Sequence, residues 1–148
     1  MNSPSLVRAI SLLDGDTLLA IVTENGEYKR SERGISALLS LATDGDTLKD
    51  ACVADIIVGK AAAMLMAFAG VKEVYGRVMS RKATEVFERH SIAYCYGELT
   101  ETIINRKGDG PCPMEMAVKD IDDVRVATTT LANAYSQMSA HSEKPFAR

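Results

Sequence analysis

The chain has 148 residues, of which 47% are hydrophobic and 25% charged, a balance typical of one globular domain whose core needs no metal or disulfide support. With 17 basic and 20 acidic residues its formal net charge is −3, which argues against a nucleic-acid-binding protein with a broad basic surface. Three cysteines, Cys52, Cys95 and Cys112, show no framework spacing, and the N-terminus shows no signal peptide, so we expect reduced thiols in a cytoplasmic protein.

The first part of the chain predicts a helix, a β-hairpin and a second helix. Apolar residues recur at helical spacing over residues 5–13, and residues 17–23 form a Leu, Ile and Val-rich strand pattern. The Asn25–Gly26 pair is a strong hairpin signal, so the returning strand begins over residues 28–30. Residues 35–41 predict a short apolar helix.

The middle of the chain alternates strand and helix patterns. It predicts strands over residues 51–58, 71–79 and 92–96, with helices over residues 61–69 and 81–90 between them. The apolar stretch 51–71 is nearly long enough to cross a bilayer. However, Asp55 and Lys60 lie near its middle, and each would cost roughly 2.5–3.5 kcal/mol at a bilayer centre. We therefore predict a strand followed by a buried helix, and no membrane association.

The last part predicts a short helix over residues 99–106, a Gly/Pro loop over 107–113, and a long helix capped by Asp122–Asp123. Residues 141–148 are expected to be a flexible tail, which leaves a core over about residues 5–140. The alternating order favours a single three-layer α/β/α domain over residues 1–148. Its mixed sheet should have about five strands, with an opening β-hairpin and a long C-terminal helix.

Several short segments are specific when taken together. They are residues 33–35, residues 54–63, Met79–Ser80 with Ala83, residues 104–106 and residues 110–115. In these segments the chain resembles an uncharacterised prokaryotic family, the domain of unknown function 1893, over about residues 17–121. The resemblance implies a cytidine-deaminase-like fold. Because domains of that fold commonly oligomerise, it also implies a homo-oligomer.

The same resemblance indicates that the catalytic zinc is missing. Active deaminases begin one helix with a His- or Cys-containing motif that includes a Glu, and the next helix with Pro-Cys-x-x-Cys. The corresponding positions here read Gly59-Lys60-Ala61-Ala62 and Ser80-Arg81-Lys82-Ala83, without a zinc ligand in either. The Pro-Cys pair at Cys112 falls one strand and one helix too late in the chain to replace the second motif. We therefore expect no zinc cofactor and no other metal site.

Five residues are candidates for ligand binding. Lys60 opens a helix directly after a strand, where free amides and the helix dipole favour an anion. Asp55 pairs with Lys60 or orients it, and Ser80 is an N-cap that could also contact a ligand. Asn105 and Arg106 end the helix predicted over residues 99–106, where the guanidinium either binds a carboxylate or phosphate or stays solvated.

Cys112 and Glu115 are the catalytic candidates. Cys112 lies in a loop before a helix start, where a thiol pKa can be lowered, and Glu115 would oppose that effect or serve as a base. Our leading hypothesis is a domain that binds a nucleotide-like or other anionic small molecule near Lys60. The alternatives are an enzyme of unassigned class, using Cys112 with Lys60 or Glu115, and a structural oligomer subunit.

Overall fold

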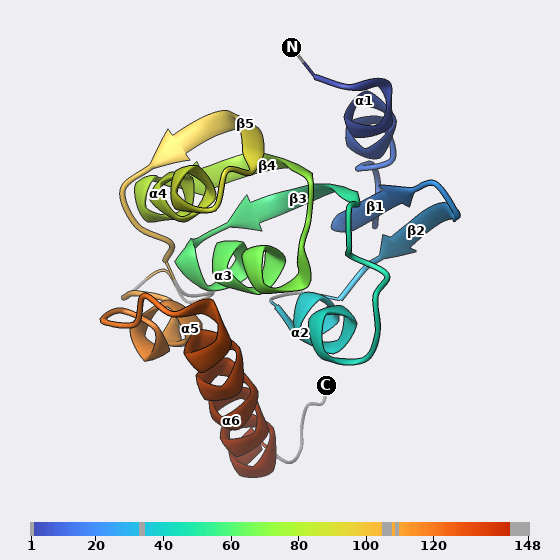
Figure 1. Cartoon of the computed structure of the whole chain (residues 1–148). Coiled ribbons are helices and arrows are strands. Elements are labelled where there is room, and N and C mark those ends of the chain that lie inside the picture. The colour runs from blue at the N-terminus through green and yellow to red at the C-terminus, as the bar shows by residue number, and fades with distance from the viewer. Residues whose placement is uncertain (1, 33–34, 105–107, 109, 143–148) are drawn as a thin grey trace.

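The computed structural model describes residues 2–32, 35–104, 108 and 110–142, with side chains up to residue 138. Its strands form one sheet in the order β2-β1-β3-β4-β5 (Figure 1). These strands are β1 (Leu19–Thr23), β2 (Gly26–Arg30), β3 (Cys52–Val58), β4 (Glu73–Ser80) and β5 (Ala93–Thr100). The helices are α1 (Pro4–Ser11), α2 (Ser36–Thr43), α3 (Lys60–Ala69), α4 (Arg81–Arg89), α5 (Pro113–Ala117) and α6 (Val124–Ser142).

The sheet is mixed, as the order of the sequence patterns predicts. β1 pairs antiparallel with β2 across the Asn25–Gly26 turn, and its other edge pairs antiparallel with β3. β3, β4 and β5 run parallel, each joined to the next through a helix. All three parallel strands therefore end at the same edge of the sheet.

Two apolar clusters separate the chain into three layers. The larger lies between the sheet and the helices α2, α3, α4 and α6, and the smaller lies under α1 on the opposite face (Figure 1). β1 is buried at four consecutive positions because Leu19 and Ile21 face the larger cluster while Ala20 and Val22 face the smaller one. A strand covered on both faces reads as a continuous apolar run, which is the pattern seen in residues 19–22.

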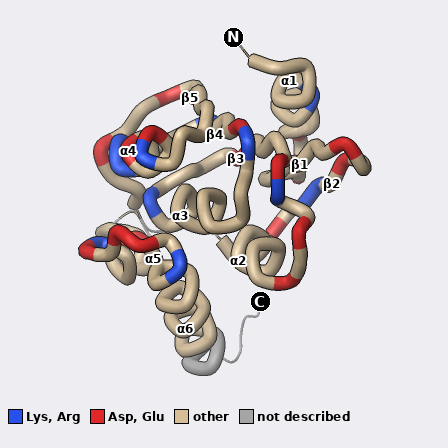
Figure 2. The backbone as a smooth tube through the Cα atoms, in the orientation of Figure 1, with Lys and Arg blue, Asp and Glu red and all other residues tan. Residues whose placement is uncertain are grey.

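Charged residues gather at the ends of elements and in loops, whereas the bodies of α3 and α6 are almost without charge (Figure 2). For α3 the reason is burial, because its residues from Lys60 to Met66 are buried. α6 packs on α3, α2 and α5 through its first half, and its second half extends away from the sheet (Figure 1). No helix in the described part of the chain is long and apolar enough to cross a bilayer.

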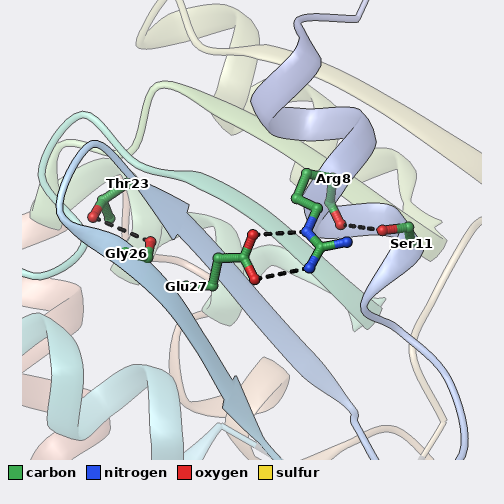
Figure 3. A network of polar contacts seen from close by, with 5 residues as sticks. All are labelled: Arg8, Ser11, Thr23, Gly26 and Glu27. Carbon is green, nitrogen blue, oxygen red and sulfur yellow. Dashed lines mark hydrogen bonds and ion pairs between the residues drawn. The ribbon is translucent and has the colours of Figure 1, made fainter.

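An ion pair connects α1 to the hairpin. The Arg8 guanidinium donates to both carboxylate oxygens of Glu27, at 2.7 Å from Nε and 3.1 Å from the second nitrogen (Figure 3). Close by, the Ser11 hydroxyl donates to the Arg8 carbonyl, and the Thr23 hydroxyl donates to the Gly26 carbonyl inside the turn (Figure 3). The ion pair is solvent-exposed, so its contribution to stability is at most about 1 kcal/mol.

One predicted element is wrong. Residues 99–106 do not begin a helix, because β5 continues to Thr100 and Ile104 forms an antiparallel bridge with Pro111. Four of the six described residues in this stretch are the β-branched Thr100, Thr102, Ile103 and Ile104, which favour extended backbone over a helix. Residues 105–107 of the predicted helix, and 143–148 of the predicted tail, lie outside the described residues.

Candidate functional site

A cavity of about 160 Å³ lies at the edge of the sheet where the three parallel strands end. Ser80 is the last residue of β4, Lys60 follows β3 by two residues, and Glu101 directly follows β5. In open α/β sheets this edge is the usual place for a ligand, because the strand-to-helix turns leave a crevice there. The cavity is lined by Lys60, Ser80, Lys82, Glu101, Thr102, Ile103, Pro111, Glu115, Met116 and Lys119.

Lys60 is the first residue of α3, and only 8% of it is exposed. Its ammonium nitrogen donates to the Lys119 carbonyl at 3.0 Å. Among the described residues, no carboxylate oxygen lies within ion-pair distance of this nitrogen. The pairing with Asp55 that the sequence suggested is therefore absent, and Lys60, which lines the cavity, has no carboxylate partner among the described residues.

Glu115 occupies the amino terminus of α3. Its carboxylate oxygens accept from the backbone amides of Lys60 and Ala61, both at 2.8 Å. Gly59 permits this approach, because a Cβ atom at that position would lie 2.6 Å from the Glu115 Cδ. The negative charge that the positive amino-terminal end of a helix dipole favours is thus supplied by the protein itself. The sequence placed an anion here but gave no signal that Glu115, 55 residues away from Lys60, would be that anion.

Ser80 caps α4, as the sequence predicts. Its hydroxyl oxygen accepts from the Ala83 amide at 3.1 Å, and the residue is 1% exposed. Because Ser80 also lines the cavity, its predicted capping role and a contact with a ligand are compatible.

The cavity is positive overall. Three lysines, Lys60, Lys82 and Lys119, are among the residues that line it, against two glutamates, Glu101 and Glu115. Glu101 is paired with the Arg81 guanidinium at 2.9 Å, and Glu115 is hydrogen-bonded to the α3 amides. Both carboxylates are therefore already engaged, and the uncompensated charge favours an anionic ligand.

Asp55 lies apart from this cavity, on β3 between Leu19 of β1 and Gly76 of β4. Burial raises the pKa of its carboxyl to about 7, although hydrogen bonds from the Ile57 and Ile56 amides act in the opposite direction. This group belongs to the middle of the sheet and not to the candidate site.

Cys112 immediately precedes α5 and is partly buried against the larger apolar cluster. Its amide donates to the Ile103 carbonyl at 3.0 Å, and it is not among the residues that line the cavity. Burial raises the pKa of the thiols of Cys52 and Cys95. A catalytic role for Cys112 with Glu115 stays a hypothesis, and Asn105 and Arg106 lie outside the described residues.

The fold and the cavity together define an α/β protein with a five-stranded mixed sheet and a basic crevice at the ends of its parallel strands. The chain belongs to the family described as "TM1506: Domain of unknown function (DUF1893)", whose model matches residues 9–134. A crystal structure of a DUF1893 family protein (TM1506) from Thermotoga maritima is similar to it, with a TM-score of 0.81 and 21% identity. The match covers 90% of this chain and 91% of that one, and at this identity it shows the fold alone. No curated protein matches the sequence.

Proposed function

We propose that this protein binds a small anionic molecule in the cavity beside Lys60. The observation that carries the proposal is the buried Lys60, which has no carboxylate partner among the described residues and lines a cavity together with two further lysines. Burying a charge without a carboxylate partner costs stability unless another group compensates for it. One backbone carbonyl, that of Lys119, supplies part of this compensation, and an anion would supply the remainder.

The position of the cavity supports a cytidine-deaminase-like arrangement of the fold, which we also propose. The resemblance aligned Lys60 and Ser80 with the two helix starts that carry zinc ligands in active deaminases. Both residues line the same cavity, although their sequence motifs lie 20 residues apart. An ammonium that donates to a carbonyl and a hydroxyl that caps a helix do not suit Zn²⁺, which takes Cys, His and carboxylate ligands. We therefore derive no zinc chemistry for this chain. Instead of a reaction at a metal, we propose that the cavity binds an anion.

The proposal is tested by measuring phosphate binding with isothermal titration calorimetry and thermal unfolding. Phosphate should bind the wild type and raise its unfolding temperature, because a ligand of the native state adds stability by mass action. Lys60→Ala should weaken binding by about tenfold or more, and Lys82→Ala, an exposed position in the same cavity, should weaken it in the same direction. Lys29→Ala is the matched control, because Lys29 is exposed on the opposite edge strand, β2.

The Lys82 variant guards against a folding defect caused by changing a buried lysine. If the wild type and all three variants bind phosphate equally, or not at all, the cavity is not an anion site. A loss with Lys29→Ala as large as that with Lys60→Ala would point to general charge and would contradict the proposal.

A further inference from the structure

We infer that the ligand is an organic phosphomonoester whose phosphate enters the cavity while an apolar body lies on the wall formed by Ile103, Pro111 and Met116. This inference rests on the proposed function and specifies the chemical class of ligand. It comes from three features of the same cavity: its size, its charge and the composition of one side.

The cavity is too small for a whole organic ligand. Its volume is about 160 Å³, whereas pockets that enclose a drug-sized molecule measure about 300–1,000 Å³. A space of this size admits a small polar group such as a phosphate. Any larger ligand must therefore keep most of its body outside, against the rim.

The charge of the cavity suits a phosphomonoester better than a carboxylate. Three lysines line it, whereas of its two glutamates Glu101 is ion-paired with Arg81, which leaves Glu115 as the one carboxylate without an ion-pair partner among the described residues. A phosphomonoester carries a charge of about −1.5 to −2 near neutral pH and presents three acceptor oxygens. One such group can meet several ammonium groups together, whereas a carboxylate brings a single negative charge.

One side of the cavity is apolar and open to solvent. Met116 is 50% exposed, Pro111 is exposed and Ile103 is half-buried. The neighbouring Ile104 is 52% exposed and forms a backbone bridge with Pro111, and the Cys112 amide donates to the Ile103 carbonyl. These backbone bonds hold the wall in place, and the unbranched Met116 thioether can adapt to the shape of an apolar or aromatic body.

The test compares three probes, inorganic phosphate, methyl phosphate and phenyl phosphate, by isothermal titration calorimetry. All three should bind the wild type in a Lys60-dependent way, and phenyl phosphate should bind about tenfold more tightly than methyl phosphate. Tenfold corresponds to about 1.4 kcal/mol. In Met116→Ser the ratio of the two dissociation constants should fall below about threefold. Val7→Ser, an equally exposed apolar position on α1, should leave the ratio unchanged.

The outcomes separate the inference from the proposed function. If phosphate binds through Lys60 but the phenyl group adds nothing, the ligand class is wrong and the anion site stands. If the phenyl group helps equally in wild type and Met116→Ser, the apolar body does not lie on this wall and the inference is overturned. If none of the three probes binds, both the inference and the anion site fail.

Discussion

Asp55 lies on β3 with strands on both sides, and burial there raises the pKa of its carboxyl from an ordinary 3.8 to about 7. A carboxyl whose pKa is raised by folding stabilises the folded state most when it is protonated in both states, below about pH 4. This contribution declines as the pH rises from about 4 to 7, and it is lost above pH 7. At about 1.4 kcal/mol for each pKa unit, the change amounts to at most about 4 kcal/mol, because Asp55 is half-buried and keeps some contact with solvent.

We predict that Asp55→Asn removes this pH dependence. Its amide oxygen can still accept from the Ile56 and Ile57 amides, but it cannot ionise. Urea unfolding should show the variant more stable than the wild type at pH 8, with the difference shrinking towards pH 4. Asp120→Asn, an exposed control, should follow the wild type at every pH. An Asp55→Asn curve parallel to the wild-type curve from pH 4 to 8 would contradict the prediction.

At the scale of elements, the start of α3 depends on a contact between two helices. The Glu115 carboxylate of α5 satisfies two amides of α3 that have no partner within the helix, and it fits only because residue 59 is glycine. We predict that Gly59→Ala destabilises the protein by about 1–3 kcal/mol, because it expels the carboxylate and leaves those amides without this acceptor.

A double-mutant cycle with Glu115→Ala checks the cause. The backbone at Gly59, with φ −101° and ψ −173°, suits alanine, so Gly59→Ala should cost little once the Glu115 side chain is removed. The free energies of unfolding of the four proteins, measured in urea, should therefore show strong coupling between the two sites. Additive effects would mean that the Gly59 substitution acts through some other contact.

The elements themselves were largely predictable, because most of them follow from local patterns. The Asn25–Gly26 hairpin, the strand–helix–strand order and the N-cap at Ser80 depend on residues close together in sequence. Periodicity alone predicts the segment after β5 as a helix, although its β-branched residues favour extended backbone. The backbone bonds that hold it extended come from later in the chain: Ile104 pairs with Pro111, and the Cys112 amide donates to the Ile103 carbonyl. Periodicity carries no information about such a bridge.

At the scale of the whole molecule, the candidate site was also only partly predictable, because some of its residues follow from local sequence and others from distant contacts. The sequence identified Lys60 and Ser80 because each begins a helix after a strand, and both line the cavity. The sequence also indicated Asp55, which lies outside the cavity. A charged residue inside an apolar strand is conspicuous in the sequence, but the sequence does not show whether it lies near the site. Met116 and Lys119 were missed, because only the packing of α5 and the turn that follows it across the ends of β3 and β4 brings them to the cavity.

The outer half of α6 bears on how whole molecules associate. From Tyr135 to Met138 every side chain is exposed, and the helix leaves the body of the domain there (Figure 1). Between Val124 and Ser142 the only Lys, Arg, Asp or Glu is Arg125. A helix segment of this length is marginal in water unless something packs against it. A second copy could pack against this surface about a twofold axis without like-charge repulsion, because the surface carries almost no charge.

We predict that the protein is a dimer held through α6, and that light scattering coupled to size exclusion gives twice the chain mass. Tyr135→Glu should shift the population to monomer, because it brings two like charges towards each other in a symmetric interface and removes an apolar ring that is 39% exposed in the single chain. Val7→Glu places the same charge on α1, which covers the opposite face of the sheet, and should leave the dimer intact. A wild type that stays monomeric at working concentration would refute the dimer. A dimer that Val7→Glu breaks and Tyr135→Glu does not would move the interface to the α1 face.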